Sequence, residues 1–362
     1  MRTVRTFESL KKFLIISFAG VFFLCGGFLC AEVAKENAVV AQENIQCSCG
    51  KFAFAECVSD IFERSKNSVI RVIGIVGAQE EGEQDSEAAQ QMQPVLSGTG
   101  FFVSDRAHVV TAASIVSSAR VLWVEYRGLS YAAECVGHDP ATNIAVIRLL
   151  QPPESFEVVD IHDTDEHSLA RIGEFAVFIG CRLDLDPAPA LGNIVGKNIS
   201  YGERAFVTTY LRSDIEICGG ESGAPVFDLR GNLIGCMVAA LPELHSSFIL
   251  PKRALRRVYD DIIKLGKVTY GAMGIDIHAE YKMGIGQQII ISRVVHDSYA
   301  EKSGLQAGDV LVSMNSFTIK HREDLHNALF FAHPGSDMRI VIVRNGEPYE
   351  FTMKVDQSVA KK

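Results

Sequence analysis

Short apolar runs separated by turn residues recur over residues 96 to 250. Among them are HVVTAAS, ARVLWVEY, NIAVIRLL and FAVFIG, with Gly, Asp and Asn in the segments between them. Many short strands joined by such turns are typical of an antiparallel barrel or sandwich. This part of the chain is therefore predicted to be mainly β.

Helical spacing appears on both sides of this β-rich stretch. Residues 58–76 predict a short helix followed by a strand, and the acidic, Gln-rich residues 77–95 predict an exposed loop. Residues 253–266 (RALRRVYDDIIKLG) predict an amphipathic helix that closes the domain. Its apolar face is formed by Leu255, Val258, Ile262 and Leu265.

A smaller unit follows over residues 271–356. Its pattern gives a strand (IIISRVV), a short helix ending at SGL, a strand (DVLVSM), a helix (REDLHNALFFA) and a hairpin. Asn345 and Gly346 supply the positive φ angles that a two-residue hairpin turn requires. These residues predict an independent, β-rich α+β domain.

The N-terminus carries the pattern of an export signal. Two arginines and two lysines precede residues 13–30, which are apolar or small and uncharged. A basic flank followed by an apolar run directs a chain out of the cytoplasm. The run is long for a cleaved signal peptide and just long enough to span a bilayer, so a signal peptide and a retained signal anchor both stay open. The polar residues 31–57 predict a tether.

Charge and cysteine usage exclude several classes of partner. The formal net charge is −9 and no basic run is present, which argues against nucleic-acid binding. Cys47, Cys49 and Cys57 cluster in QCSCGKFAFAEC, and pairing within this cluster would suit an exported chain. A metal site would need a fourth ligand, and none is near. The sequence therefore predicts neither a metal nor a cofactor.

The strongest motif is CGGESGAPVFD, residues 218–228. Its Gly-x-Ser-Gly pattern places the Ser222 hydroxyl on a tight turn that glycine permits. The backbone N–H groups of Gly220 and Ser222 can then point at one position. Two fixed donors of this kind form an oxyanion hole, which stabilises the negative charge that develops in acyl transfer.

Five stretches in register carry a resemblance to a known family: SGTGFFVS (97–104), VVTAASIV (109–116), HDPATNIAVIRL (138–149), SDIEICGGESGAPVFDLRGNLIG (213–235) and SFILP (247–251). The chain resembles the trypsin-like serine proteases of the HtrA/Deg type over roughly residues 58–356. This resemblance implies a chymotrypsin-like double β-barrel over residues 58–266, followed by one PDZ domain over residues 271–356.

In this family the catalytic His, Asp and Ser occur in that chain order. Residue by residue, the His position falls on Ser114, the Asp position on Asn143 and the Ser position on Ser222. A serine hydroxyl is not a general base near neutral pH, so Ser222 lacks a proton acceptor. The nearest histidines in sequence, His108 and His138, are expected to be solvated loop residues. The resemblance therefore implies a retained nucleophile without its triad.

The second resemblance-based site is a PDZ carboxylate-binding loop within KVTYGAMGIDIH, residues 267–278. Successive N–H groups of such a loop hold a peptide C-terminus while the peptide adds to the sheet as a strand. An apolar C-terminal residue is the expected preference. The loop residues are Ala272, Met273, Gly274 and Ile275, and the groove helix contributes Leu325 and Leu329.

These features favour an exported HtrA-like protein with an inactive protease domain. Its PDZ domain would bind peptide C-termini or unfolded chains in envelope protein quality control or its regulation. The location is expected to be periplasmic or otherwise extracytoplasmic, with residues 13–30 holding the chain at the inner membrane if they are not removed. Two alternatives stay open: an active endopeptidase that uses Ser222 with an unconventional base, and an adaptor. A homotrimer or an assembly with an active relative is a further expectation.

Overall fold

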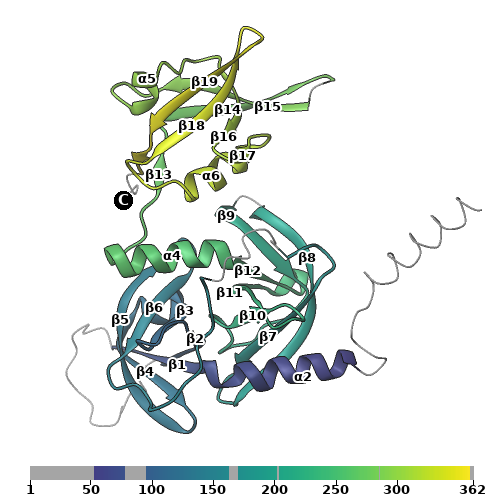
Figure 1. Cartoon of the computed structure of the whole chain (residues 1–362), viewed down its shortest axis with the longest axis vertical. Helices are drawn as coiled ribbons and strands as arrows, with labels where there is room; N and C mark the ends of the chain where they lie inside the picture. Colours follow the sequence, from purple (N-terminus) through teal and green to yellow (C-terminus); the bar gives the residue numbers. More distant parts are fainter. Residues whose placement is uncertain (1–52, 78–94, 163–169, 202–203, 285, 359–362) are drawn as a thin grey trace, which may run out of the picture. The chain divides into compact units, whose positions relative to one another are not determined.

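The computed structural model describes residues 53–77, 95–162, 170–201, 204–284 and 286–358 (Figure 1). The apolar residues 13–30 lie outside these ranges, as do Cys47 and Cys49, so the export segment and the disulfide stay predictions. Among the described residues, no helix has both the length and the apolar character needed to cross a membrane.

Six antiparallel strands close a first barrel in the order β1-β2-β3-β6-β5-β4. Their alternate side chains point inward, and Val72, Val109 and Ile147 are fully buried. A short helix, α3 (Ala113–Val116), follows β3 directly. The strands are β1 (Val69–Val76), β2 (Val95–Phe102), β3 (His108–Ala112), β4 (Ala119–Tyr126), β5 (Leu129–Asp139) and β6 (Ile144–Leu149).

Six further strands close a second barrel in the order β10-β11-β12-β9-β8-β7. Phe178, Leu211 and Ile249 are fully buried in its interior. The two closed barrels confirm the predicted double β-barrel. The strands are β7 (Phe175–Cys181), β8 (Pro187–Tyr201), β9 (Arg204–Ser213), β10 (Pro225–Phe227), β11 (Leu233–Leu241) and β12 (Ser246–Pro251), with the 3₁₀ turn η2 (Pro242–Leu244) between the last two.

Helices precede and follow the barrels. Helix α2 (Ala53–Ser65) begins earlier than the predicted residue 58, is buried through Ile61, and leads through the 3₁₀ turn η1 (Lys66–Ser68) into β1. Helix α4 (Lys252–Leu265) matches the predicted amphipathic helix. Leu255, Val258 and Ile262 are fully buried, whereas Leu265 is 55% exposed. Leu265 is the last residue of the helix, and Gly266, in the left-handed conformation, ends the helix directly after it.

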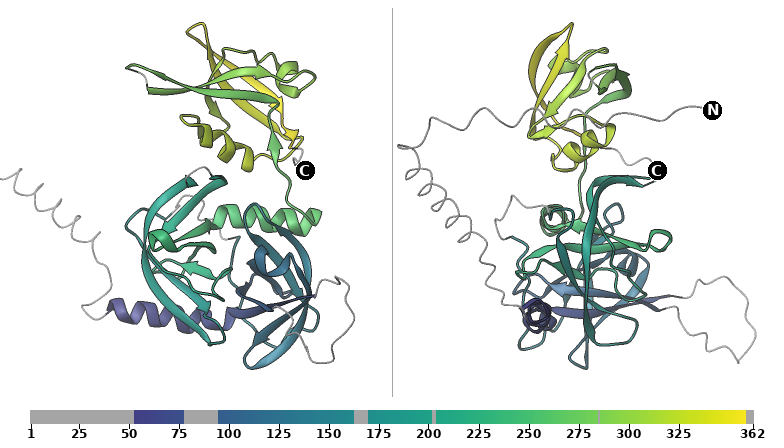
Figure 2. Two further views of the ribbon diagram at one scale, coloured as in Figure 1. Left: turned by 180° about the vertical axis from the view of Figure 1, so that it is seen from behind. Right: turned by 90° about the vertical axis from the view of Figure 1, so that its right-hand side faces the viewer.

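The C-terminal domain is built on a sheet with the strand order β14-β15-β16-β18-β19, which leaves β14 and β19 at the two edges. Its predicted hairpin turn is confirmed, since Asn345 and Gly346 have φ angles of 54° and 88°. The β14–β15 hairpin extends beyond the rest of the sheet (Figure 2). The elements are β13 (Gly271–Ala272), β14 (Ile275–Lys282), β15 (Gly286–Val294), α5 (Tyr299–Ser303), β16 (Val310–Met314), β17 (Phe317–Thr318), α6 (Arg322–Phe330), β18 (Asp337–Arg344), β19 (Glu347–Lys354) and β20 (Asp356–Gln357).

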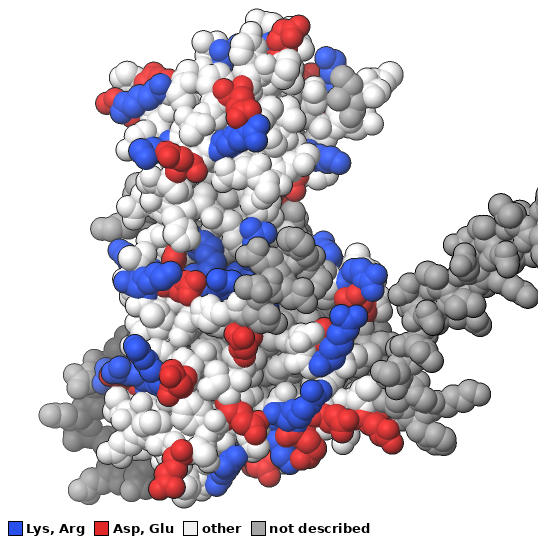
Figure 3. All heavy atoms as spheres, viewed as in Figure 1, with Lys and Arg blue, Asp and Glu red and all other residues white. Residues whose placement is uncertain are grey.

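Acidic and basic side chains are interspersed on the face shown in Figure 3. Several charged side chains of the described residues form exposed ion pairs, such as Arg339 with Glu350 and Lys354 with Asp337. Exposed pairs of this kind contribute little to stability, so the buried clusters inside the two barrels and in the C-terminal domain hold the fold together.

Candidate active site and peptide-binding groove

Ser222 lies in the turn that leads into β10, half-buried between two glycines with φ angles of 92°. The turn is fixed by hydrogen bonds to both barrels. The carbonyl oxygen of Gly219 accepts from the Leu183 N–H at 2.8 Å, and that of Gly220 accepts from the Thr99 hydroxyl at 2.7 Å. The carbonyl oxygen of Ser222 itself accepts from the Thr99 N–H at 2.9 Å. The turn is therefore held from several sides.

Within the part of the chain that the structure describes, the N–H groups of Gly220 and Ser222 donate to no protein acceptor. A trans peptide holds its N–H opposite its carbonyl oxygen. Since the Gly219 carbonyl points at Leu183, the Gly220 N–H points away from it. Two backbone donors beside the Ser222 hydroxyl are thus available to a ligand. Such an arrangement can stabilise a developing oxyanion.

Glu221 is the residue between the two donors, and its side chain is almost fully buried. One carboxylate oxygen accepts from Arg182 Nε at 3.1 Å, and the other accepts from the Cys218 N–H at 2.5 Å. The hydrogen bond to Glu221 raises the pKa of Arg182. Sequence reasoning missed Arg182, although a buried acidic residue in a Gly-x-Ser-Gly turn needs a positive partner. The hydrogen bond from Cys218 closes the turn on itself, and the ion pair ties the turn to Arg182, which follows β7.

The structure brings Ser114 and Asn143 together at the end of the first barrel. The N–H of the exposed Ser114, in α3, donates to Asn143 Oδ1 at 2.8 Å. Asn143 Nδ2 donates to the carbonyl oxygen of Val238, on β11, at 2.7 Å. The Asn143 side chain therefore uses both its acceptor and its donor, and links the two barrels.

Asn143→Asp is expected to lower the free energy of unfolding by about 1–3 kcal/mol. A carboxylate cannot donate, so an oxygen would face the Val238 carbonyl oxygen where the amide now donates at 2.7 Å. Urea unfolding near neutral pH measures the loss. It should shrink at acidic pH, where a protonated Asp can donate.

Asn315→Asp is the matched control, because Asn315 also has a positive φ and its Oδ1 accepts a backbone N–H, that of Arg339. A carboxylate keeps that interaction. Equal effects of the two substitutions would contradict the role assigned to Nδ2 of Asn143.

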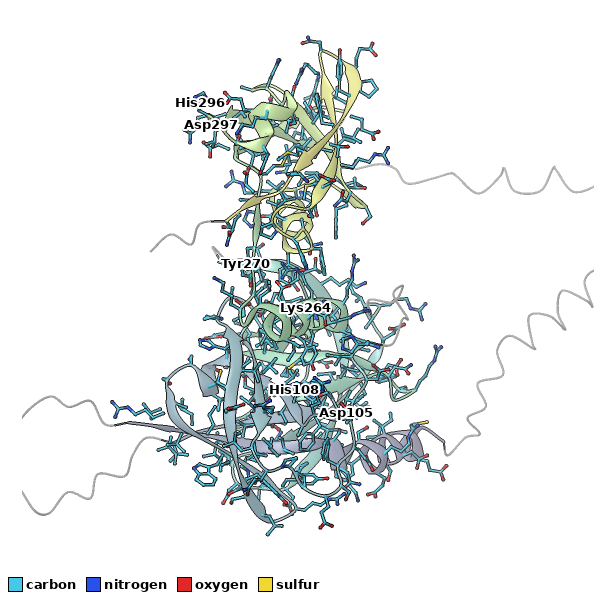
Figure 4. All side chains as sticks on the ribbon, turned by 60° about the vertical axis from the view of Figure 1, so that its left-hand side comes forward. Asp105, His108, Lys264, Tyr270, His296 and Asp297 are labelled. Carbon is cyan, nitrogen blue, oxygen red and sulfur yellow. The ribbon has the colours of Figure 1, made fainter. Side chains whose placement is uncertain are left out.

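Both nearby histidines lie on strands, His108 on β3 and His138 on β5, and not in the solvated loops that the sequence predicted. His108 pairs with Arg148 at the far end of β3, four residues or about 13 Å of strand from Ala112. Its Nδ1 lies 3.0 Å from Ser104 Oγ, and burial lowers its pKa (Figure 4). His138 is exposed, with Nδ1 4.0 Å from the Cys135 sulfur.

Asp139 supports the turn that carries Asn143. Its Oδ2 accepts from the Thr142 N–H at 3.0 Å, from the Thr142 hydroxyl at 2.5 Å and from the Tyr270 hydroxyl at 2.6 Å. Burial, and then the charge of Asp139, raise the pKa of Tyr270 (labelled in Figure 4). Asp139 is committed to these contacts, so it does not substitute for an acid at position 143.

In the C-terminal domain, the predicted carboxylate-binding loop lies between β13 and β14. Among the described residues, the N–H groups of Met273 and Gly274 donate to no acceptor. The Gly274 carbonyl accepts from the Val295 N–H, so the next pair, Ile275 with Val294, is a non-hydrogen-bonded one. The backbone groups of Ile275 therefore face the free edge of the sheet. An extended peptide can add there as a strand.

The predicted groove residues divide into two groups. Met273 and Leu325 are 3% and 6% exposed and belong to the core of the domain. Ile275 and Leu329 are half-buried, as is Ile277, which sequence reasoning missed. The alternation of side chains along β14 could have found Ile277, two residues after Ile275. These three side chains keep part of their apolar surface exposed. Ala272, also half-buried, pairs with β20.

Comparisons with known sequence families agree with this architecture. Residues 98–236 match the trypsin-like peptidase domain family, and residues 271–355 match the PDZ domain family. The chain combines a trypsin-like peptidase domain with a PDZ domain. Together with the relatives described next, these two matches support a relationship of the chain to the HtrA family.

The curated relatives are bacterial proteases. The chain is 29% identical over 279 residues to a probable periplasmic serine endoprotease, DegP-like, of Chlamydia trachomatis, covering 74% of this chain and 55% of the relative. A DegP-like protein of Brucella suis is 27% identical over 275 residues, covering 73% and 53%. The chain thus spans about half the length of these relatives. The solved HtrA-type protease AlgW with a tripeptide shares the fold, with a TM-score of 0.67 at 21% identity over 84% of this chain and 98% of that one.

Proposed function

We propose that this chain is an HtrA-type protein that binds unfolded chains or peptide C-termini without hydrolysing them. The observation that carries the proposal is Ser114, whose exposed hydroxyl occupies the position where the family has its base. Asn143 supports it, because its side-chain hydrogen bonds within the described residues go to backbone groups, the Ser114 N–H and the Val238 carbonyl. Without a base, Ser222 keeps its proton at neutral pH.

The size of the deficit favours a binding role. In trypsin, an Asp→Asn change alone lowers kcat by about 10⁴, because the histidine is held in the wrong tautomer. Loss of the histidine costs about as much as loss of the whole triad. The free N–H groups of Gly220 and Ser222 would leave an acceleration over water of about 10³–10⁴, which is too small for a working protease.

The relatives support the proposed setting. They are named as periplasmic serine endoproteases, which favours an extracytoplasmic location and a role in protein quality control there. Anchoring through residues 13–30, a homotrimer, and an assembly with an active relative remain part of this proposal.

A working endopeptidase is the second candidate, favoured by the retained Ser222 and its two free backbone donors. Incubating the full chain and its Ser222→Ala variant with an unfolded substrate separates the two candidates. Cleavage by the wild-type chain that Ser222→Ala abolishes would establish the endopeptidase. No cleavage by either, together with saturable binding, would support the binding role.

Gly274→Ala is expected to weaken peptide binding at the PDZ groove at least tenfold. Gly274 has a φ of 63°, and a Cβ there would lie 2.4 Å from the Ser298 Cβ, so the loop must shift. Fluorescence anisotropy with a labelled apolar peptide measures the affinity.

Gly284→Ala is the control, because Gly284 also has a positive φ (80°) but nothing lies within 4 Å of its added Cβ. Equal affinities for the two variants would show that the peptide does not use this loop.

A further inference from the structure

An acidic side chain borders the carboxylate-binding loop of the PDZ domain. Asp356 lies on β20 and pairs with Ala272 on β13, the strand that leads into the loop. A Cβ placed on Gly274 would lie 3.2 Å from Asp356 Oδ2, so this oxygen is next to the loop backbone. The strand pairing fixes the Asp356 backbone at this position.

The bordering oxygen lacks a donor. Asp356 Oδ2 is buried and has no hydrogen-bond partner in the part of the chain that the structure describes. A buried acceptor without a donor is unfavourable, because it has lost its hydrogen bonds to water. A ligand that brings an N–H or O–H group to this oxygen would remove that cost.

The charge of Asp356 also opposes the usual ligand of such a loop. The free N–H groups of Met273 and Gly274 attract an anion, whereas an ionised Asp356 beside them repels one. A free peptide C-terminus adds a second carboxylate and has no N–H to offer Asp356. A segment from within a chain is neutral at this point, and its backbone continues with a further N–H.

We propose that Asp356 makes this groove select internal segments of unfolded chains over free C-terminal carboxylates. This inference rests on the proposed peptide-binding function and names its substrate class. Asp356 is a specificity-determining residue here: its charge opposes a second carboxylate beside the loop, and its carboxylate turns out of its buried position to accept from the ligand N–H that follows the residue held at Gly274. Half-buried Ile275, Ile277 and Leu329 hold apolar side chains of the segment whichever way it ends.

The test compares ligand ends on the full chain. The probes are fluorescein-labelled peptides of eight alternating Thr and Val residues that end in Val, as the free acid, as the C-terminal amide, and with four further Ser and Gly residues after the last Val. The amide and the extended peptide are expected to bind the wild-type chain about tenfold more tightly than the acid. Asp356→Asn should tighten binding of the acid about tenfold and bring the ratio close to one.

Glu350→Gln is the matched control, since Glu350 is an exposed carboxylate on β19 that pairs with Arg339. It should leave the ratio unchanged. The ratio of the affinities for the amide and the acid is measured on the wild-type chain, so it tests the inference even if Asp356→Asn misfolds.

Binding of the acid at least as tight as that of the amide would overturn the inference and leave peptide binding standing. An amide-to-acid affinity ratio that stays the same in a folded Asp356→Asn variant would also overturn the inference and leave peptide binding standing. Failure of all three peptides to bind, or binding that Gly274→Ala does not weaken, would instead overturn the proposed function at this groove, and the inference with it.

Discussion

A Ser114→His/Asn143→Asp variant is expected to cleave an unfolded substrate that the wild-type chain leaves intact. The nucleophile turn is already held by Thr99 and Leu183, and its two backbone donors are free. Under the proposed function, the groups to restore are a proton acceptor for Ser222 and a carboxylate that orients it. Supplying both should raise the rate at least 10⁴-fold, the loss that follows from removing such groups.

Release of fluorescent fragments from labelled, unfolded casein measures this gain on the full chain. Adding Ser222→Ala to the repaired variant is the control and should remove the new activity. Cleavage by the wild-type chain that depends on Ser222 would show that the proposed inactivity is wrong. Silence of the folded, repaired variant would show that the turn has lost its catalytic geometry as well as its base.

The two substitutions of the repair should also be coupled in stability. Asn143→Asp alone places an oxygen against the Val238 carbonyl, whereas a histidine at position 114 offers an N–H to that carboxylate. The cost of Asn143→Asp should therefore be smaller in the Ser114→His background, by about 1 kcal/mol in a double-mutant cycle. Additive costs would mean that the new side chains do not meet.

Local patterns in the sequence were enough to predict a β-rich barrel or sandwich, the C-terminal domain and the Asn345–Gly346 turn, whereas the double barrel followed from the family resemblance. Strand alternation and turn residues act over a few positions, so they can be read without the fold. The register of the five family-like stretches also assigned Ser114 and Asn143 to the His and Asp positions of the family, and the structure joins these two residues through one hydrogen bond. Leu265 shows the limit of periodicity, because helical spacing does not reveal where the helix leaves the core.

Contacts between distant segments could not be predicted in this way. Arg182 and Glu221 are 39 positions apart, and Asn143 and Val238 are 95 apart. Each pair exists because the barrels bring separate loops to one place. Asp356 reaches the carboxylate-binding loop only because β20 returns to pair with β13. In each case the sequence shows one residue of the pair, but which residue contacts it depends on how the strands are connected in the fold.

Gly223→Ala is expected to destabilise the peptidase domain more than any other single change considered above. Gly223 follows the nucleophile, and its Cβ would lie 2.3 Å from the Thr99 carbonyl oxygen and 2.6 Å from the Ala112 nitrogen. Both atoms belong to the backbone of the first barrel, so they cannot rotate away as a side chain would. The substitution must push the turn off that barrel.

Gly173→Ala separates this clash from backbone strain, because Gly173 has the same φ of 92° but open space around its added Cβ. The left-handed conformation alone costs about 1–3 kcal/mol in either variant, and the clash at Gly223 should add about 2–3 kcal/mol. Trp123, the single tryptophan, lies on β4 of the first barrel, so its fluorescence during urea unfolding reports the difference. Equal midpoints for the two variants would mean that the turn adapts freely. The donors of Gly220 and Ser222 would then not be fixed by the barrels, and restoring the triad would not be enough to restore catalysis.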